Sequence, residues 1–443
     1  MKKLAYEDIL ELIEQNKINK LKEDLNRLHS GDIAQIINDL PSEYQASTFR
    51  LLNDENASDV LPDLHDELRE QILKEIQENR LVKIIDEMET DEATDIISEL
   101  DEDRSRELLE KIDEEDSEEI KQLLEYDEES AGGLMQTEII ALQKEMKRDE
   151  MIEYIRQNYE DVENIHYVFV VDFENKLIGV LEITRLLLAK PDTKAEDIMD
   201  KEVVSATVDL DQEKVAHLFR KYDLYILPVV DNESHLLGRI TVDDIIDVID
   251  EEASEDAYKM VGLESEDRVF TSPLSSVRKR LPWLTLNLFT ALLVSSVVGI
   301  FEQTIDRLSF LAVLMPIVAG LGGNSGTQTL TVITRGIALG ELTIHNTLKA
   351  IFKEISVGII NGILIGSAAM LIAYLLKGEI MLGVVLGVAM ICNMFIAGLI
   401  GSSIPVVMKT LKIDPALASS VIITMLTDIG GFASFLGLAT LLL

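Results

Sequence analysis

The sequence predicts a multidomain protein: an all-α helical solenoid, a duplicated α/β pair, and a polytopic α-helical membrane domain with five spans. Three observations predict this fold class. A short helical repeat occupies the N-terminal region, strand-like runs recur in the middle, and long uncharged stretches follow near the C-terminus. We place the domains at residues 1–130, 131–254 and 283–443, with a connecting helix over 255–282.

Charge divides the 443-residue chain into two regions suited to different solvents. The chain has 80 acidic and 40 basic side chains, and the 161 residues from Trp283 onward hold seven of each. The first 282 residues therefore carry the whole net charge of −40. A surface this acidic repels phosphate backbones, which excludes nucleic acid as a partner. The single cysteine, Cys392, excludes a disulfide framework and a thiolate metal cluster.

Residues 33–124 repeat with a period of 12. Counting from Ile33, offsets 3, 4 and 7 of the repeats are apolar at 22 of 24 positions, beginning with Ile36-Ile37-Leu40. This spacing marks one face of a helix. Because the pattern restarts every 12 residues, with breakers such as Pro41 and Pro62, it favours short helices stacked as a solenoid. The alternative is an ordinary helical bundle, and either would be a spacer or interaction module without catalytic residues.

A second duplication lies in the middle of the chain. Val170-Val171-Asp172 and Leu177-Ile178-Gly179-Val180 recur 59 residues later as Val229-Val230-Asp231 and Leu236-Leu237-Gly238-Arg239. Each copy predicts a strand, a helix, a strand, a tight turn, a strand and a helix. This arrangement resembles a tandem pair of CBS domains.

The CBS resemblance implies a nucleotide site in one copy. In that family a T-x-x-D motif after the last strand can hold a ribose, and Thr241 and Asp244 fit it. The first copy has Glu182 and Arg185 at these positions, which argues against a site there. Binding of ATP therefore stays open for the second copy.

Acidic residues crowd around the duplicated pair. Glu251, Glu252, Glu255 and Asp256 follow its last helix, and one turn of the solenoid carries Asp91, Glu92 and Asp95. A solvated face is one explanation. However, like charges oppose the packing of two such surfaces, whereas hard divalent cations favour carboxylate oxygens. The pattern therefore also indicates divalent-cation sites.

Five stretches are each long enough to cross a bilayer, which takes about 20 apolar residues. They are Trp283–Phe301, Leu308–Thr334, Ile355–Leu376, Ile380–Met408 and Pro415–Leu443. We expect no cleaved signal peptide, because the segment from Met1 to Asp8 has no apolar core. With a cytosolic N-terminus, eight basic residues flank the spans on the cytosolic side and two, Arg307 and Lys377, on the other. This asymmetry predicts an extracytoplasmic C-terminus.

Polar residues inside two of the spans indicate a path for an ion. The second span contains Pro316 and Gly322-Gly323-Asn324-Ser325-Gly326-Thr327-Gln328. Its glycines are also explained by close helix packing, but the polar side chains among them favour a surface that faces water or an ion. Asp428 is the one charged residue in the fifth span and lies roughly 20 Å along it, counted from Pro415. Burying its unpaired charge costs at least ~2.5–3.5 kcal/mol, so we expect an aqueous path or a cation beside it. The alternative is a protonated Asp428 packed between helices.

Three motifs carry a resemblance over the full length of the chain. They are Ala131-Gly132-Gly133-Leu134-Met135, the polar segment Gly322–Gln328, and Asp414-Pro415-Ala416-Leu417 leading to Asp428. With the order of the domains, they make the chain similar to the bacterial MgtE magnesium channel family. The resemblance implies a homodimer with a pore lined by the second and fifth spans. It also implies that cytosolic Mg²⁺ closes the pore by binding at interfaces of the solenoid, the CBS pair and the connecting "plug" helix.

The resemblance also implies roles for individual residues. Asp428 is the pore carboxylate, with Gly320 and Asn324 nearby, and Asp414 attracts ions at the cytosolic mouth. The family's Mg²⁺-sensing positions fall on Asp59, Asp91, Asp95, Gly133 and Arg220 (the last two through their carbonyls), Asp211, Glu213, Asp223, Asp244, Glu252, Glu255 and Asp256. In the last span, Ser420 and Val421 replace the Asn-Pro common in relatives.

We therefore expect a homodimeric Mg²⁺-gated magnesium channel of the plasma membrane, not an enzyme, that takes up Mg²⁺ and maintains its cellular level. The sequence contains no nucleophile, phosphate loop or metal–water hydrolase motif, so the membrane potential is the expected driving force. One rival is a membrane-anchored CBS nucleotide sensor that regulates a partner protein. Another is a transporter of a different divalent cation such as Co²⁺.

Overall fold

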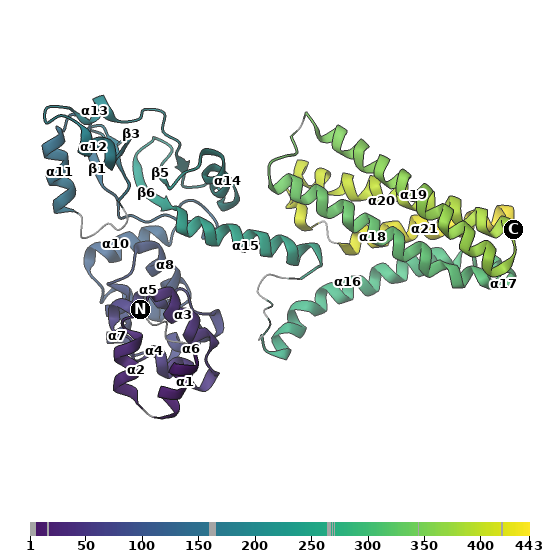
Figure 1. Cartoon of the computed structure of the whole chain (residues 1–443), viewed down its shortest axis with the longest axis horizontal. Helices are drawn as coiled ribbons and strands as arrows, with labels where there is room; N and C mark the ends of the chain where they lie inside the picture. Colours follow the sequence, from purple (N-terminus) through teal and green to yellow (C-terminus); the bar gives the residue numbers. More distant parts are fainter. Residues whose placement is uncertain are drawn as a thin grey trace. The chain divides into compact units, whose positions relative to one another are not determined.

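The computed structural model describes residues 6–15, 17–158, 165–263, 267, 269, 271–343, 345–417 and 420–443. These residues form two compact units, Met1–Ile249 and Asp250–Leu443 (Figure 1). The segment from Met1 to Ala5, part of the expectation about a signal peptide, lies outside the described residues.

The first unit begins with short helices whose first residues are 12 positions apart. In the described part of the chain they are α1 (Tyr6–Glu14), α2 (Ile18–Leu25), α3 (Ser30–Asp39), α4 (Ser42–Phe49), α5 (Asp54–Val60), α6 (Asp66–Glu75), α7 (Glu78–Ile85), α8 (Thr90–Ser98), α9 (Glu102–Leu109) and α10 (Glu114–Leu123). The predicted short helices of residues 33–124 are thus confirmed. The period extends back to Tyr6, which the apolar pattern alone did not show.

Several of the short helices pack on the helix two positions along the chain. The pairs α3 with α5, α5 with α7, and α4 with α6 are in contact, and they bury the predicted apolar positions, Phe49 and Ile84 among them. Side chains make similar connections: Asn38 Nδ2 of α3 donates to the Asp63 carbonyl, just after α5, at 3.1 Å, and Arg104 Nε of α9 donates to Glu78 Oε1 of α7 at 2.6 Å. This alternation is a stacked array, as a solenoid requires.

The duplicated pair forms two three-stranded sheets with the same topology. Strands β1 (Ala141–Gln143), β2 (Tyr167–Val171) and β3 (Leu177–Glu182) make the first sheet, and β4 (Ala206–Thr207), β5 (Ile226–Val230) and β6 (Leu236–Thr241) the second. In each sheet the first pair of strands is parallel and the second antiparallel. The helices of the pair are α11 (Arg148–Gln157), α12 (Ile183–Leu188), α13 (Ala195–Ile198), α14 (Gln212–Tyr222) and α15 (Val242–Met260).

The duplication extends to individual hydrogen bonds in the two tight turns. Asn175 and Ser234, 59 residues apart, both have a positive φ, of 61° and 70°. Asp172 and Asp231 each accept backbone N–H groups across their own turn. The two turns also bind each other, because Leu177 N donates to the Ser234 carbonyl and Leu236 N to that of Asn175. The copies are therefore related by an approximate two-fold axis.

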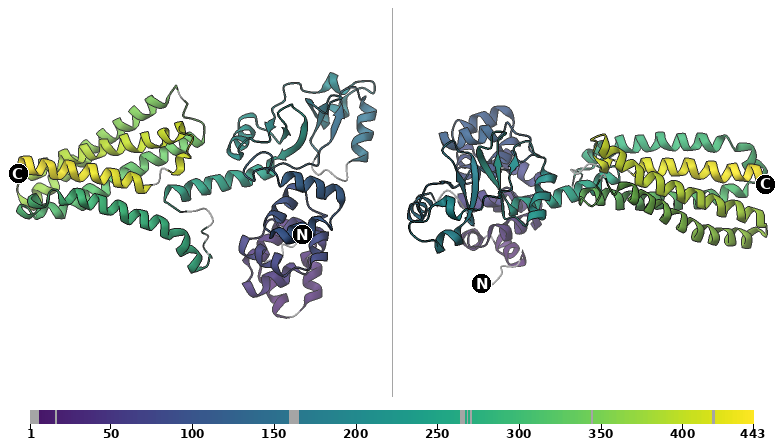
Figure 2. Two further views of the ribbon diagram at one scale, coloured as in Figure 1. Left: turned by 180° about the vertical axis from the view of Figure 1, so that it is seen from behind. Right: turned by 90° about the horizontal axis from the view of Figure 1, so that it is seen from above.

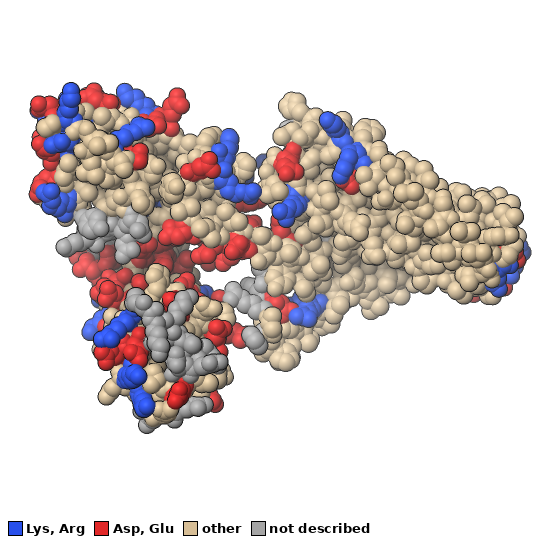
Figure 3. Space-filling view, in the orientation of Figure 1, with Lys and Arg blue, Asp and Glu red and all other residues tan. Residues whose placement is uncertain are grey.

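Among its described residues, the second unit contains five helices long and apolar enough to cross a membrane, as predicted. They are α16 (Pro273–Gly299), α18 (Phe310–Ala338), α19 (Thr347–Lys377), α20 (Ile380–Thr410) and α21 (Ser420–Leu442), with α17 (Glu302–Arg307) between the first two and a 3₁₀ turn, η1 (Pro415–Leu417), before the last. The helices run along one another in each view (Figure 2). Charged residues gather at the ends of this unit and leave its middle bare (Figure 3).

The connecting segment over 255–282 is not one helix, contrary to the prediction. Its first residues continue α15, which ends before Gly262, where a φ of 74° stops a right-handed helix. Its last residues belong to α16, which begins at Pro273 after the Ser272 cap. The domain boundaries proposed from the sequence stay predictions, because the helices run across them.

Helix α20 is the centre of the membrane unit. It packs on α18, α19 and α21, whereas α16 packs on α21. Glycines bring α19 and α20 into close contact: a Cβ added at Gly366 would lie 2.7 Å from the Gly387 carbonyl. This packing fixes how α18 and α21, the two spans predicted to line a pore, lie beside α20.

Candidate functional site

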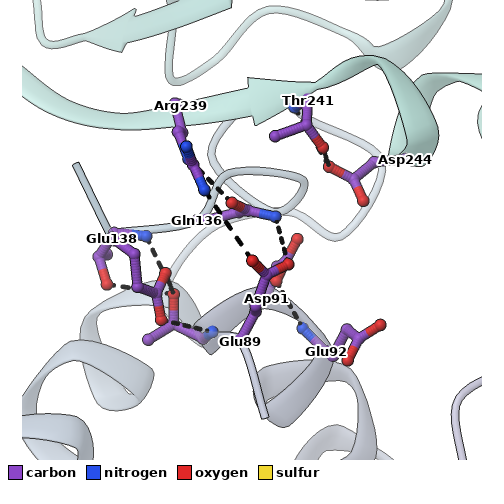
Figure 4. Close-up of polar contacts among 10 residues, drawn as sticks. Glu89, Asp91, Glu92, Gln136, Glu138, Arg239, Thr241 and Asp244 are labelled. Atoms are coloured by element: carbon purple, nitrogen blue, oxygen red, sulfur yellow. Dashed lines mark hydrogen bonds and ion pairs between the residues drawn. The ribbon is translucent and has the colours of Figure 1, made fainter. Parts of the chain in front are cut away.

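The first group of predicted site residues lies where the solenoid meets the second CBS-like copy. Asp91 and Glu92 come from the first turn of α8, and Asp244 from the first turn of α15 (Figure 4). Asp91 is 7% exposed, and its Oδ1 accepts the Glu92 backbone N–H at 2.9 Å. Asp244 Oδ2 accepts the Thr241 hydroxyl at 2.5 Å and the Thr241 N–H at 3.2 Å. The two residues of the T-x-x-D motif, Thr241 and Asp244, are therefore hydrogen-bonded to each other.

Burial and mutual repulsion make these carboxylates hard to ionise. Burial raises the pKa of Asp91 well above its usual range, and the charges of Asp244 and Glu89 raise it further. Burial also raises the pKa of Glu92 to about 8, with contributions from Glu89 and Asp244, and that of Asp244 to about 6. Ionisation of these groups therefore opposes the packing of the two surfaces.

Hydrogen bonds and a buried arginine connect the same two surfaces. Gln136 Nε2 donates to Glu89 Oε2 at 2.8 Å, and Arg239 Nε donates to Gln136 Oε1 at 3.0 Å. The Arg239 guanidinium is buried and lies 3.9 Å from Glu89 Oε1, so it brings a positive charge to this interface (Figure 4). Thr90 donates its N–H and hydroxyl to Glu138 at 3.0 and 2.9 Å.

The remaining solenoid and CBS candidates are more scattered. Asp59 and Asp95 are exposed, and the charge of Asp59 contributes to the raised pKa of Glu92. A Cβ at Gly133 would lie 2.5 Å from the Asp127 carbonyl, so only glycine fits there.

Helix α14 keeps four of the candidates apart. Asp211 and Glu213 lie at its start and Arg220 and Asp223 at its end, all exposed. Asp211 and Asp223, at the two ends of α14, are about 18 Å apart along the helix axis. The described chain therefore does not bring these four together.

A second group surrounds Lys259 in the Asp250–Leu443 unit. The Lys259 ammonium lies 2.5 Å from Glu255 Oε1 and 2.8 Å from Asp414 Oδ2, a residue 155 positions away. Burial disfavours the charged ammonium, but hydrogen bonds to Asp414 and Glu255 outweigh it and raise the pKa of Lys259. Burial and the Asp414 charge raise the pKa of Asp256. Glu252, one turn before, is half-buried.

Sequence reasoning missed three members of these groups. Glu92 was noted only as part of an acidic turn, and Arg239 only as part of a repeated motif. The signal for Arg239 was that the first copy has the apolar Val180 at the equivalent position. Lys259 could have been found, because it lies four residues after Glu255 on a predicted helix.

The carboxylates have the ligand atoms that suit Mg²⁺, but they are not arranged as a complete metal-binding site. Carboxylate and carbonyl oxygens are the ligands that Mg²⁺ prefers. Among the described residues, however, no three or more His, Cys, Asp or Glu side chains converge on a metal position. A bound cation would need water or further ligands.

In the membrane unit, Asp428 is half-buried on α21. Its Oδ1 is buried without a hydrogen-bond partner among the described residues. Because α21 begins at Ser420 rather than Pro415, Asp428 lies about 12 Å along the helix and not the 20 Å expected. Val421 is buried in the first turn of α21.

Helix α18 has two different faces. Its buried face carries Gly322, which meets Asn393, and Gly326, which meets Ile423. Its exposed face carries Gly320, Asn324 and Gln328, spaced four residues apart, followed by Thr331. Close packing explains Gly322 and Gly326, whereas an added Cβ at Gly320 would meet nothing within 4 Å among the described residues.

Family models match most of the chain. The MgtE intracellular N domain matches residues 28–129, the CBS domain residues 131–192 and 195–251, and the MgtE divalent cation transporter domain residues 315–438. The chain belongs to the MgtE family. The magnesium transporter MgtE of Enterococcus faecalis is 38% identical over 72% of this chain and 71% of its own length, and that of Thermus thermophilus 35% identical over 72% of each.

Solved MgtE structures agree with the first unit. The cytosolic domain of the Mg²⁺ channel MgtE, crystallised with ATP, matches 55% of this chain and all of its own with a TM-score of 0.53 and 33% identity. Members of the MgtE family are transporters and not enzymes. The chain is accordingly a multi-pass membrane protein of this family.

The raised pKa values predict a pH-dependent interface. Without divalent cations, the first unit should lose stability as the pH rises from about 6 to about 8, because Glu92, whose pKa is raised to about 8, must then ionise at a buried site that favours its protonated form. Glu92→Gln should reduce this loss, and exposed Glu102→Gln on the next helix should not. Thermal unfolding of the purified chain with a chelator tests this. Equal wild-type melting temperatures at both pH values would contradict it.

Proposed function

We propose that the chain is a homodimeric Mg²⁺ channel whose pore is formed by α18 and α21 of both subunits. The observation that carries the proposal is the polar face of α18, with Gly320, Asn324 and Gln328 exposed in a membrane span that packs against the Asp428 helix. Lipid would leave these polar groups and the carboxylate without partners. A second subunit and a water-filled path between them would satisfy both.

The proposed pore suits a largely hydrated ion. Mg²⁺ gives up its water reluctantly. One carboxylate per subunit, with amide and carbonyl oxygens nearby, can hold that water by hydrogen bonds while Asp428 supplies the charge. The magnesium transporters of Enterococcus faecalis and Thermus thermophilus support Mg²⁺ as the cargo.

Removing the pore charge should stop transport. We expect Asp428→Ala to reduce Mg²⁺ flux into liposomes sharply while the dimer still assembles, and Asp428→Asn to impair flux as well, because the shape remains but the charge is lost. Glu379→Gln, at the exposed start of α20, removes an equal charge outside the proposed pore and should conduct normally. Normal Mg²⁺ flux through purified Asp428→Ala protein would refute the pore assignment.

We place the protein in the plasma membrane with its N-terminus in the cytosol and its C-terminus outside. The excess of Lys and Arg on one side of the five spans supports this orientation. A tag after Leu443 should be accessible from outside intact cells, and a tag before Met1 only after permeabilisation. Both tags on one side would contradict it.

Closure by cytosolic Mg²⁺ and control of the cellular Mg²⁺ level form the second part of the proposal. The group of Asp91, Glu92 and Asp244 and the group of Glu255, Asp256 and Asp414 both contain carboxylates whose pKa values burial and repulsion raise. Mg²⁺ at these groups would relieve the repulsion and so favour the packed, closed form. The scattered candidates Asp59, Asp95, Gly133, Asp211, Glu213, Arg220, Asp223 and Glu252 would complete sites shared with bound water or a second subunit.

Magnitudes show that closure needs many sites. A cation at a concentration equal to its Kd stabilises the form it binds by about 0.4 kcal/mol. Moving a gate from 1:99 to 99:1 takes about 5.5 kcal/mol. Roughly six sites in each of two subunits would supply about 5 kcal/mol. Closure should therefore be steep in Mg²⁺ and should depend on several carboxylates together.

Neutralising the candidate sensor should leave the channel open. We expect Asp95→Ala alone to shift the closing Mg²⁺ concentration modestly. Neutralising Asp91, Asp95, Asp244, Glu252, Glu255 and Asp256 together should keep the channel conducting at Mg²⁺ levels that close the wild type. Patch recording of reconstituted channels measures this.

A matched control separates the sensor from overall charge. Six exposed carboxylates outside both groups can be neutralised instead, with the same change in net charge: Glu23, Glu70, Glu107, Glu153, Glu174 and Glu202. This control should close as the wild type does. A sensor variant that also closes at the wild-type concentration would place the sensor elsewhere.

Two other functions make different predictions. A membrane-anchored CBS sensor would give no ion flux with the purified protein alone, and a Co²⁺ transporter would prefer Co²⁺ in competition. ATP binding at the second CBS copy is compatible with the channel, since Thr241 and Asp244 are retained and a related cytosolic domain was crystallised with ATP.

A further inference from the structure

Asn393 is a fully buried amide at the centre of the membrane unit. It lies on α20 and has no exposed surface. Its Nδ2 donates to the Val318 carbonyl of α18 at 2.8 Å. Its Oδ1 is buried and has no hydrogen-bond partner among the described residues. Since an unsatisfied acceptor in a membrane interior costs free energy, an apolar side chain would serve simple packing better.

Two glycines on different helices make room for this amide. A Cβ at Gly322 of α18 would lie 2.1 Å from Asn393 Nδ2, and a Cβ at Gly431 of α21 would lie 2.7 Å from the same atom. The amide cannot turn aside without giving up its hydrogen bond to Val318. Asn393 is thus held between the two helices on which the proposed pore depends.

The contacts of Asn393 are next to the proposed pore residues. Val318 and Gly322 lie two residues before and after Gly320 on α18, and Gly431 lies three residues after Asp428 on α21. Asn393 therefore contacts both pore helices at the level of their predicted ion-facing groups. No other residue of α20 is described with a side-chain hydrogen bond to the α18 backbone.

We propose that Asn393 is a positioning residue of the pore, which sets the spacing of Gly320, Asn324 and Asp428 without contacting the ion. This inference rests on the proposed channel function. It assigns the specificity of the pore partly to a span that does not line it. Because a hydrated ion is selected by the spacing of the groups around it, a change at Asn393 should alter selectivity as well as rate.

The first test compares ion selectivity. In purified, folded dimers, Asn393→Leu should lower Mg²⁺ flux about tenfold and change the ratio of Mg²⁺ to Ca²⁺ flux. Ser402→Ala is the matched control: Ser402 is equally buried on α20, but among the described residues its hydroxyl bonds only to its own helix, at the carbonyls of Gly398 and Leu399. The control should keep the wild-type ratio. An Asn393→Leu protein with the wild-type ratio would overturn the inference, even if less of it folds.

The second test uses the glycine contact and does not depend on Asn393→Leu folding. Gly322→Ala alone should reduce Mg²⁺ flux, because its methyl group meets the Asn393 amide. In an Asn393→Ala background that amide is absent, so Gly322→Ala should cause little further loss. Gly437→Ala on α21, with nothing within 4 Å of the added Cβ, should be neutral in both backgrounds. Equal losses from Gly322→Ala in both backgrounds would contradict the contact.

Asp428→Ala in the same assay separates the two proposals. If Asp428→Ala conducts normally, the pore assignment fails. If Asp428→Ala gives no Mg²⁺ flux while Asn393→Leu keeps the wild-type flux and ion ratio, the proposed channel function is supported and the proposed role of Asn393 is wrong.

Discussion

A bilayer interior offers no water to polar groups, and the membrane unit is organised around that constraint. Asp428 brings a carboxylate into α21, and α18 presents Asn324 and Gln328 on an exposed face. Among the described residues, Asp428 Oδ1 has no hydrogen-bond partner, although other helices of the unit pack closely, as the glycine contacts of α19 and α20 show. These polar groups are therefore the ones on which the proposed dimeric pore depends.

In the first unit the main constraint is the excess of negative charge, which opposes the packing of its surfaces. The solenoid and the second CBS copy bring Asp91, Glu92 and Asp244 together at a buried surface, and repulsion among them raises their pKa values. The protein compensates in part with fixed cations, Arg239 in this unit and Lys259 in the other. These fixed cations offset part of the negative charge of the neighbouring carboxylates.

Local patterns predicted the elements of the fold well. Apolar spacing located the short helices, and the recurrence of Val170-Val171-Asp172 located paired strands with matching turns. Hydropathy gave the number of spans correctly. The errors occurred at element ends: the connecting helix was divided at Gly262, and α21 began at Ser420. Helix ends depend on caps and turns, which a hydrophobic pattern does not record.

The sequence by itself determined the kinds of element, their order and the family. It also separated an acidic region from a region of apolar, membrane-spanning helices. Periodicity, hydropathy and motifs could show this because they are properties of neighbouring residues. Only the tertiary structure decided which charges meet. It placed Lys259 beside Asp414, 155 residues away, and Asn393 against Val318, 75 residues away. It also kept the ends of α14 apart, so that Asp211 and Asp223 share no site within the described chain. Burial and proximity set pKa values and hydrogen bonds, and both arise from packing between distant segments rather than from spacing along the chain.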